Sequence, residues 1–405
     1  MARKMYIVGG GLAGLTAAAT AARSGAEVVV LEARTSLGGR ARTEERNGFL
    51  FNQGAHALYA GGVGISILRE LGVTVVGKQP PLKGYGQLRG KVGLMPGSPM
   101  DLVRSPLLGV KAKAQLGRLL AKPLTLLKTE TASRSMQQWV EEQVSHLDAR
   151  LFVLMAARTA TYQDDMTTIA AAVAVPQTVS ALTKGVLYLD GGWKQLVESL
   201  EDVAIRAGAK IDTESKVASI REVPDADAIV LAVGGPGQVA KLLDDNSSAA
   251  NEWARRARPV YASGLDLGLA RLPKPERRFC LCADAPLYFS THTPTAELAP
   301  EGSELVHVLA YGTAHENPRA QMEEYLDAVQ PGWKAEVRAE QFGKHWLVAH
   351  DRPTPEMGSL TSRPGPRVPG YDNVFVAGDW VGAHGLLADA SIASGREAGH
   401  LASSA

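Results

Sequence analysis

A glycine turn near the start of the chain constrains the fold more than any other feature of the sequence. It reads Gly9-Gly10-Gly11-Leu12-Ala13-Gly14 and follows the short apolar segment Met5–Val8. In a Gly-x-Gly-x-x-Gly pattern the first glycine allows a tight turn and the second lets the backbone approach a pyrophosphate. The third lets a helix pack closely on a strand. The spacing therefore predicts a dinucleotide site between a strand and a helix.

The residues that follow complete a strand–helix–strand unit. Leu12–Ser24 is rich in alanine and predicts a helix that ends at Gly25, and Val28–Leu31 predicts a second strand that is buried on both faces. The helix N-terminus would present N–H groups and a partial positive charge to phosphates. Glu32 closes the second strand, at the position where a carboxylate accepts hydrogen bonds from an adenosine ribose.

The segment after Glu32 distinguishes between dinucleotides. It runs from Arg34 to Thr43 and contains Gly38-Gly39-Arg40. The glycine pair lets the backbone lie against a ligand, and Arg40 can bind a pyrophosphate from the side opposite the turn. A nicotinamide dehydrogenase does not need this second contact. The alternative interpretation is a solvated basic loop.

The pattern of elements along the chain predicts an α/β fold. Helices are expected near Val110–Leu127, Met136–Val144 and Leu151–Ala157, in a stretch without strand–helix alternation. Regular alternation returns near Gly191, where apolar residues at helical spacing from Trp193 to Val203 predict a helix, and Lys210–Asp212 and Ala228–Val233 predict strands. Asn373–Ala377 predicts a further strand, and a helix is expected from about Leu387 to Leu401. We therefore expect a discontinuous Rossmann-type FAD-binding domain with an inserted α+β substrate domain. The first comprises residues 1–75, 186–250 and 360–405, and the second, a cap, comprises residues 76–185 and 251–359.

These motifs resemble a known family at both ends of the chain. The glycine turn, Glu32 and Gly38-Gly39-Arg40 look like the N-terminal signature of the flavin-containing amine oxidase superfamily, which includes phytoene desaturases and protoporphyrinogen oxidase. Asn373–Trp380 resembles that family's second flavin motif, and Ser394–Ala398 resembles the helix after it. The motifs are closest to the desaturase-like branch, while the middle of the chain resembles the family only weakly.

The resemblance implies roles for particular residues. Asp379 would bind the ribityl–phosphate arm of FAD, and Val217 would hold the adenine through its backbone. A helix starting near Ala388 would point its N-terminus at the flavin pyrimidine, where reduced flavin carries negative charge. The cofactor-binding residues expected on these grounds are Gly9, Gly11, Leu12, Ala13, Gly14, Glu32, Ala33, Arg34, Gly39, Arg40, Gly54, Ala55, Val217, Gly378, Asp379 and Ala388.

The cysteines favour non-covalent FAD. Covalent members of the family carry a cysteine shortly before the Gly-Asp block, whereas the two cysteines of this chain, Cys280 and Cys282, lie far upstream of Gly378. Two cysteines this close in sequence seldom form a disulfide with each other. We expect both to be ordinary strand residues.

Two residues are candidates for catalysis. Relatives tend to have Asp-x-Gly-x-His where this chain has Asn52, Gly54 and His56. His56 would lie near the flavin or substrate, or alternatively form hydrogen bonds within a domain interface. Trp380 would face the isoalloxazine or alternatively pack in the core.

The leading functional hypothesis is the transfer of a hydride from an apolar small molecule to flavin N5. Oxidation of C–C bonds is preferred, because amine oxidases usually surround the flavin with aromatic side chains and this chain has His384-Gly385-Leu386 at that point. The alternatives are an amine oxidase that produces imine and hydrogen peroxide, reduced flavin acting on an allylic alcohol, and a flavin-binding partner protein without turnover. The electron acceptor would be dioxygen or a quinone.

The composition of the chain argues against several classes of binding partner. The chain has 43 basic and 42 acidic residues, so no bulk charge favours nucleic acid. No metal-ligand spacing is evident, no apolar run reaches the ~20 residues of a membrane helix, and we expect a cytoplasmic protein. Leu102–Lys128 is basic and apolar, and predicts either a peripheral membrane contact or a cap helix with a solvated basic face.

Overall fold

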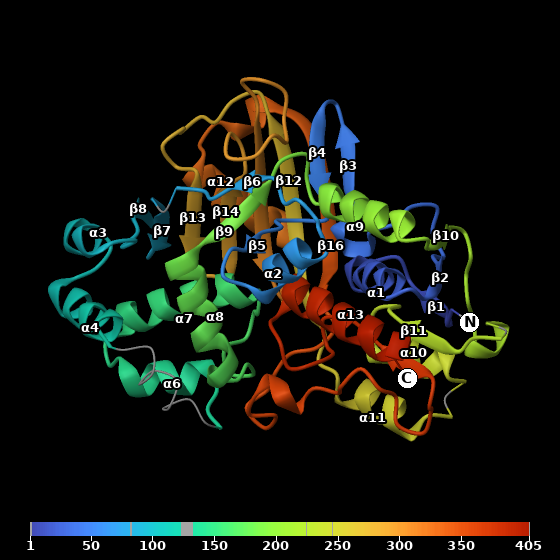
Figure 1. Ribbon diagram of the computed structural model, residues 1–405. Helices are drawn as coiled ribbons and strands as arrows, with labels where there is room; N and C mark the ends of the chain where they lie inside the picture. Colours follow the sequence, from blue (N-terminus) through green and yellow to red (C-terminus); the bar gives the residue numbers. More distant parts are fainter. Residues whose placement is uncertain (1, 82, 123–132, 224, 245, 405) are drawn as a thin grey trace.

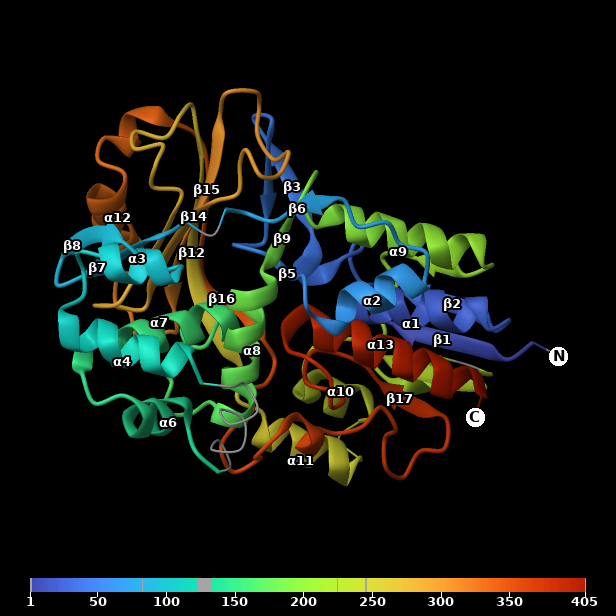
Figure 2. The same ribbon diagram turned by 60° about the vertical axis from the view of Figure 1, so that its left-hand side comes forward.

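The computed structural model describes residues 2–81, 83–122, 133–223, 225–244 and 246–404 and shows a mixed α/β fold. Two large sheets lie side by side, as both ribbon views show (Figures 1 and 2). One is a five-stranded sheet in the order β10-β2-β1-β11-β17, and the other is a seven-stranded sheet in the order β16-β12-β15-β14-β13-β7-β8.

The five-stranded sheet is parallel and contains the first strand of the chain at its centre. Met5 and Ile7 pack with the helices on one face, and Val8 packs in a separate apolar cluster on the other, which is why the strand is apolar throughout. Its strands come from segments far apart in sequence. They are β1 (Lys4–Val8), β2 (Glu27–Leu31), β10 (Lys210–Asp212), β11 (Ala228–Leu231) and β17 (Val374–Val376).

Helices cover both faces of the parallel sheet. The apolar cluster on the face of Met5 joins α1 (Leu12–Arg23), α2 (Val63–Glu70), α9 (Lys194–Arg206) and α13 (Leu387–Ser404), and the opposite face is covered by α10 (Pro236–Leu242) and α11 (Ser248–Arg256). The predicted helix and strand segments of this part of the chain agree with α1, α9, α13 and the five strands within one to three residues.

The last helix contacts the first one at backbone distance. A Cβ atom on Gly395 would lie 2.3 Å from the carbonyl oxygen of Ala13, and one on Gly399 would lie 2.7 Å from that of Ala17. Only glycine permits this approach, and Figure 1 shows α13 along the side of α1. The C-terminal helix α13 is therefore packed directly against α1, the helix that follows the glycine turn.

The seven-stranded sheet combines strands from both predicted cap segments. Its face toward α12 (Pro318–Val329) is apolar, with Met322, Leu326 and Val329 buried against it. Its strands are β7 (Tyr85–Leu88), β8 (Lys91–Leu94), β12 (Val260–Leu269), β13 (Phe279–Cys282), β14 (Leu287–Thr291), β15 (Glu304–Tyr311) and β16 (Val337–Ala349). Strands β7 and β8 lie in a stretch where the sequence predicted helices and turns.

A group of helices packs beside this sheet (Figure 2). It contains α3 (Pro99–Arg104), α4 (Val110–Leu120), α6 (Met136–Gln143), α7 (Leu147–Thr161) and α8 (Ala171–Lys184). The predicted helix Val110–Leu127 ends at Leu120, and its residues 123–127 lie outside the described residues. Helix α8, which has Pro176 inside it, was not predicted.

The other elements of the fold are short strands and single turns. The remaining strands form a hairpin and a three-stranded sheet, and they are β3 (Thr43–Arg46), β4 (Phe49–Asn52), β5 (Leu58–Tyr59), β6 (Gly77–Lys78) and β9 (Val186–Leu189). Short 3-10 turns are η1 (Gly39–Ala41), η2 (Ile220–Glu222), η3 (Trp333–Glu336) and η4 (Leu360–Ser362). Across the described ranges, no helix has both the length and the apolar character needed to cross a membrane.

The cysteines are strand residues, as predicted. Cys280 and Cys282 are free and buried on β13, and burial raises the pKa of Cys280 to about 12. Both thiols pack in the apolar cluster under α12.

Candidate active site

A cavity of about 610 Å³ lies at the carboxyl end of the parallel strands, where open α/β sheets bind their ligands. Every predicted cofactor residue except Gly14 lines it. These residues are Gly9, Gly11, Leu12, Ala13, Glu32, Ala33, Arg34, Gly39, Arg40, Gly54, Ala55, Val217, Gly378, Asp379 and Ala388. The fold thus brings together residues that the sequence places at opposite ends of the chain, although their contacts with a cofactor stay a prediction.

The glycines of the turn differ in how much space surrounds them. Gly9 has φ +106°, and a Cβ there would lie 2.5 Å from the carbonyl oxygen of Ala232. A Cβ on Gly14 would lie 1.9 Å from the carbonyl oxygen of Gly9, whereas one on Gly11 would meet nothing closer than the oxygen of Gly38 at 4.0 Å. Gly14 therefore serves helix–strand packing, and the open space at Gly11 fits the approach of a pyrophosphate.

Glu32 holds the turn as well as facing the cavity. Its Oε2 accepts a hydrogen bond from the Gly10 backbone N–H at 2.7 Å, and its Oε1 accepts one from the Arg34 N–H at 2.9 Å. The carboxylate therefore orients two cavity-lining segments, a role that the sequence did not predict.

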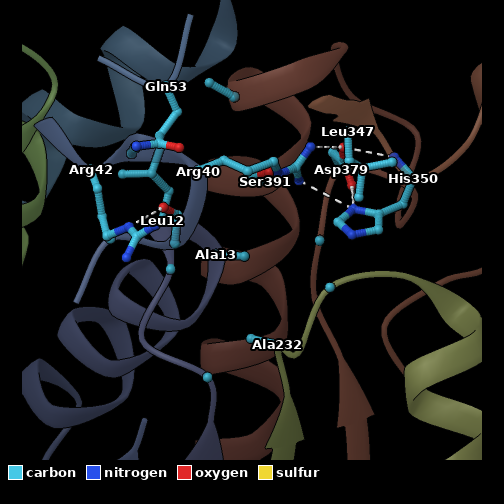
Figure 3. Close-up of a pocket in the computed structure, with 18 of the residues that line it drawn as sticks. Leu12, Ala13, Arg40, Arg42, Gln53, Ala232, Leu347, His350, Asp379 and Ser391 are labelled. Carbon is cyan, nitrogen blue, oxygen red and sulfur yellow. Dashed lines mark hydrogen bonds and ion pairs between the residues drawn. The ribbon is translucent and has the colours of Figure 1, made fainter. Parts of the chain in front are cut away.

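Three charged or titratable side chains converge on the C-terminal side of the cavity (Figure 3). Arg40 Nη1 donates to Asp379 Oδ2 at 2.9 Å and to the Val348 carbonyl at 2.6 Å. His350 Nδ1 lies 2.8 Å from Asp379 Oδ1, and the His350 backbone N–H donates to Oδ2 at 3.1 Å. Burial alone would raise the pKa of Asp379, but the charges and hydrogen bonds of Arg40 and His350 hold it well below its ordinary value. Asp379 is thus an ionised, almost fully buried carboxylate.

The Gly-Asp motif is fastened to the last helix. Ser394 Oγ lies 2.9 Å from both the N–H and the carbonyl oxygen of Gly378, so it can bond both backbone groups. This contact explains why a serine stands beside Gly395 in the helix that follows the motif.

His56 lines the cavity, and its ring is held on two sides. Its Nδ1 lies 2.9 Å from the Gly54 carbonyl, which can only accept, so Nδ1 carries the proton. The edge of the ring meets Trp193 at 4.9 Å between centroids. Burial lowers the pKa of His56, so the imidazole is neutral near pH 7. Its catalytic role stays a prediction.

Asn52 is a buried hydrogen-bond acceptor. Its Oδ1 accepts hydrogen bonds from the Trp193 N–H at 2.9 Å and from Thr43 Oγ1 at 2.8 Å, and its side chain is buried. A neutral amide satisfies these donors without burying a charge.

Of the two alternatives for Trp380, the structure supports packing in the core. Its indole N–H donates to the Gly234 carbonyl at 2.7 Å, and its ring packs against Trp253 in the apolar cluster under the sheet. Trp380 is buried and does not line the cavity, so the core-packing alternative holds. It lies behind Gly378 instead, where a Cβ would be 2.9 Å from its Nε1.

Trp346 also lines the cavity, and the sequence did not single it out. Its indole occupies space that three glycines leave free, since a Cβ on Gly264, Gly343 or Gly54 would lie 2.2, 1.9 or 3.2 Å from it. Glycines inside strands often mark such a close approach. Gly264 in β12 and Gly343 in β16 were the available signal.

One wall of the cavity is formed by uncharged side chains, which include Tyr59 and Tyr162. Tyr162 donates to the Ala55 carbonyl and Tyr59 to the Ala160 carbonyl, each at 2.7 Å. Burial raises the pKa of both phenols far above the neutral range. Leu309 and Ala262 also line this part of the cavity. In the described ranges, no group of side chains is arranged to hold a metal ion.

Asp389, at the start of α13, should make the free energy of unfolding depend on pH. Its buried carboxylate accepts a hydrogen bond from the Gly64 N–H at 2.7 Å, and burial raises its pKa from 3.8 to about 6. The folded state therefore holds the proton more tightly than the unfolded state, and the free energy of unfolding falls as pH rises from about 4 through 6. Asp389→Asn should raise that free energy by about 2 kcal/mol at pH 7.5 and by close to zero at pH 4.

Denaturant unfolding of the full chain at the two pH values would measure this difference. Asp202→Asn, on an exposed carboxylate paired with Arg206, is the matched control and should change little at either pH. Equal effects of Asp389→Asn at both pH values would contradict the raised pKa.

Comparisons with known proteins agree with this geometry. The sequence profile described as "Flavin containing amine oxidoreductase" matches residues 12–243. Protoporphyrinogen oxidase 2 of Arabidopsis thaliana is 29% identical over 153 residues, which cover 37% of this chain and 29% of that protein. An oxidoreductase from Methanosarcina mazei has a TM-score of 0.77 at 21% identity, covering 97% of this chain and 98% of its own. Cyclohexylamine oxidase from Brevibacterium oxydans has a TM-score of 0.74 at 15% identity, covering 100% of this chain and 99% of its own.

Proposed function

Because the chain belongs to the family of flavin containing amine oxidoreductases, we propose that this FAD-dependent oxidoreductase takes a hydride from an apolar small molecule. FAD supplies the hydride acceptor at N5 when it is bound. The residues of the chain supply binding, orientation and an uncharged substrate wall. The match to the Arabidopsis protein covers less than a third of that protein, so its substrate is no evidence for this one.

We propose a Rossmann-type FAD-binding domain built from residues 1–75, 186–250 and 360–405. All five strands of the parallel sheet fall in these segments, which supports the division. The strands of the seven-stranded sheet fall in residues 76–185 and 251–359, which supports an inserted α+β substrate domain.

The cavity residues fit the parts of FAD. Gly11 and the start of α1 would hold the pyrophosphate from one side and Arg40 from the other, with Glu32 and Val217 toward the adenosine and Asp379 toward the ribityl arm. Non-covalent attachment is supported by the cysteines, because both pack on β13 and neither lines the cavity.

The observation that carries the substrate proposal is the uncharged wall of the cavity around Tyr162. His56, Tyr59, Tyr162 and Leu309 present neutral or apolar groups to the cavity, and His56 is neutral because burial lowers its pKa. Such a wall fits a neutral apolar molecule, because burying a charge there without a partner would cost several kcal/mol. We therefore favour C–C or ring dehydrogenation.

An amine oxidase that produces imine and hydrogen peroxide is the second candidate. Tyr59, Tyr162, Trp193 and Trp346 all line the cavity, although His384-Gly385-Leu386 lacks aromatic residues. Aromatic faces attract ammonium groups, so these four rings give this second candidate its support. Since the chain is an oxidoreductase, a flavin-binding partner protein without turnover is set aside.

The partners remain proposals. Dioxygen or a quinone would reoxidise the flavin. Peripheral membrane contact through Leu102–Lys128 is supported by Val103 and Val110, which are 69% and 84% exposed on α3 and α4, next to basic residues. Residues 123–128 of that segment lie outside the described residues. A cytoplasmic location stays a prediction.

An anaerobic screen tests the proposed function. The purified yellow protein should be bleached by a neutral polyene, terpenoid or reduced cyclic compound and not by simple primary amines, with dithionite as the positive control. Readmitting air or adding a quinone identifies the acceptor, and peroxide release marks an oxidase. Bleaching by amines alone would select the second candidate. A colourless protein that FAD cannot reconstitute would overturn both.

A further inference from the structure

Arg158, near the end of α7, is a partly buried arginine that has no acceptor. Its Nε is sealed from solvent without a hydrogen bond, and its guanidinium forms no ion pair with any described residue. Burial lowers the pKa of Arg158, but an arginine keeps its proton in proteins. The protein therefore holds a positive charge that no described carboxylate neutralises.

Asp164 is the carboxylate that interacts with this charge, but it is already paired. Its Oδ1 accepts a hydrogen bond from Arg352 Nη2 at 2.6 Å, so these two residues balance each other. The other polar neighbours of Arg158 are the Tyr311 phenol and the Cys282 thiol, and burial raises the pKa of both, which keeps them uncharged near pH 7. An arginine that loses water without gaining a partner destabilises the fold, so its presence calls for an anion from outside the chain.

The Tyr311 hydroxyl is a second donor without an acceptor. The side chain is 2% exposed, and its hydroxyl makes no hydrogen bond with any described residue. Thr159, which adjoins it, donates its own hydroxyl to the Met155 carbonyl at 3.0 Å. Arg158 and Tyr311 thus offer N–H and O–H donors to one region, and a carboxylate has the two acceptor oxygens that such donors bind. Its single negative charge also matches that of Arg158, whereas a phosphate group carries nearly two.

These donors lie directly behind the uncharged wall of the cavity. Tyr311 follows Leu309 by two residues on β15, so the two side chains point to the same face of the strand, about 7 Å apart. Arg158 precedes Tyr162 by four residues, at the end of α7, and side chains four residues apart share one face of a helix. Leu309 and Tyr162 both line the cavity, and the Tyr162 and Tyr311 rings are 6.2 Å apart between centroids.

We propose that Arg158 and the Tyr311 hydroxyl form a carboxylate-binding site behind the uncharged wall of the cavity. The carboxylate is either one end of the substrate or a free small acid, and both share the same chemistry. The first case rests on the function proposed above. It narrows the substrate class to an apolar acid, whose neutral part lies against His56 and Tyr59 while its acid group lies at Arg158.

Arg158→Met in the purified full chain separates a binding role from a structural one. Methionine is unbranched and uncharged, so the melting temperature without ligand should equal or exceed that of wild type, whereas loss of a structural arginine would lower it. Octanoate should raise the melting temperature of wild type only. By calorimetry Arg158→Met should bind octanoate at least ~10-fold more weakly, the loss expected for a charge-assisted hydrogen bond. The neutral probe 1-octanol should bind both proteins equally.

Two further variants test the two donors separately. Tyr311→Phe removes only the hydroxyl and should weaken octanoate binding about threefold to tenfold. Arg150→Met is the matched control on the same helix, because Arg150 Nε donates to the Val144 carbonyl. It should lower the melting temperature and leave the octanoate affinity unchanged.

Comparing octanoate with acetate identifies the source of the carboxylate. Octanoate binding that is tighter by ~10-fold or more assigns it to the substrate, because the apolar chain is then buried as well, and a smaller ratio assigns it to a free acid. Wild-type octanoate affinity in Arg158→Met, a lowered melting temperature of that variant without ligand, or no binding of either acid by wild type would overturn the proposal. If wild type binds octanoate but no apolar compound bleaches its flavin, the proposed function fails and the carboxylate site stands.

Discussion

Replacing Gly14 with alanine is expected to abolish FAD binding and to destabilise the protein by about 3 kcal/mol or more. The new Cβ would lie 1.9 Å from the carbonyl oxygen of Gly9 and 3.3 Å from the Cβ of Ala232. Gly9 cannot yield, because the Ala232 carbonyl closes it in from the other side. Helix α1 must therefore move away from β1, and its N-terminus no longer points at the pyrophosphate. Flavin content by absorbance and the melting temperature would record both effects.

Gly11→Ala separates cofactor binding from folding and is the matched control. Gly11 has φ −79° and ψ −179°, which alanine adopts freely, and its Cβ would have no protein neighbour nearer than 4.0 Å. Stability should stay within about 0.5 kcal/mol of wild type, while FAD affinity should fall at least ~100-fold because the methyl group fills the phosphate approach. Normal flavin content and melting temperature in Gly14→Ala would refute the packing argument.

Arg40→Ala is expected to lower the free energy of unfolding by about 2 to 4 kcal/mol at pH 7 and to weaken FAD binding. Asp379 is 1% exposed and would remain as a buried charge without its strongest partner. The Arg40 side chain is 38% exposed, so we take the lower part of the range for buried pairs. The folded-state pKa of Asp379 is depressed below its ordinary 3.8, so the stabilisation is present above about pH 4 and is lost as pH falls. The difference between variant and wild type should therefore shrink in acid.

Denaturant unfolding across pH 3 to 8 would measure this profile. Arg46→Ala removes an arginine whose partner, Glu44, is 2.9 Å away with both side chains 45% exposed, so it should cost less than about 0.5 kcal/mol. Arg40→Lys keeps the charge but cannot reproduce the guanidinium contacts with Asp379 and Val348, so an intermediate loss is expected. Equal small effects of Arg40→Ala and Arg46→Ala would show that Asp379 does not depend on Arg40.

The fold could be predicted where short-range signals agree. The apolar runs of β1, β2 and β11 and the alanine-rich α1 were found from the sequence, because burial on both faces and glycine turns mark them locally. Strands β7 and β8 were missed, since each contains a glycine, Gly86 or Gly93, and few β-branched residues. Pairing of β7 with β13 makes them strands, and that partner lies nearly 200 residues away.

Helix α8 was missed for a related reason. Pro176 removes a backbone donor from its interior, and valines lower its helix propensity. Val173, Ala174 and Val175 are buried in two apolar clusters, and this burial outweighs the low helix propensity of the segment. Packing energy of this kind is invisible in a window of the sequence.

The residues of the candidate site also divide into those that the sequence predicted and those that it missed. The glycine turn, Glu32, Arg40 and Asp379 were predicted, because each lies in a motif whose spacing reflects a local backbone requirement. His350, Trp346 and Asp389 were missed, since none belongs to such a motif. His350 meets Arg40 across 310 residues, and Trp346 depends on glycines from two strands.

The sequence by itself predicted a dinucleotide site at the glycine turn and predicted that the two ends of the chain meet at that site. A turn with three glycines admits few conformations, and that restriction is local. Only the tertiary structure decided that Trp380 is a core residue, that Asn52 is a buried acceptor, and that His350 completes the group around Asp379. Those outcomes depend on which segments pack against each other. Such packing buries surfaces that lie far apart in the sequence, so no local pattern reveals it.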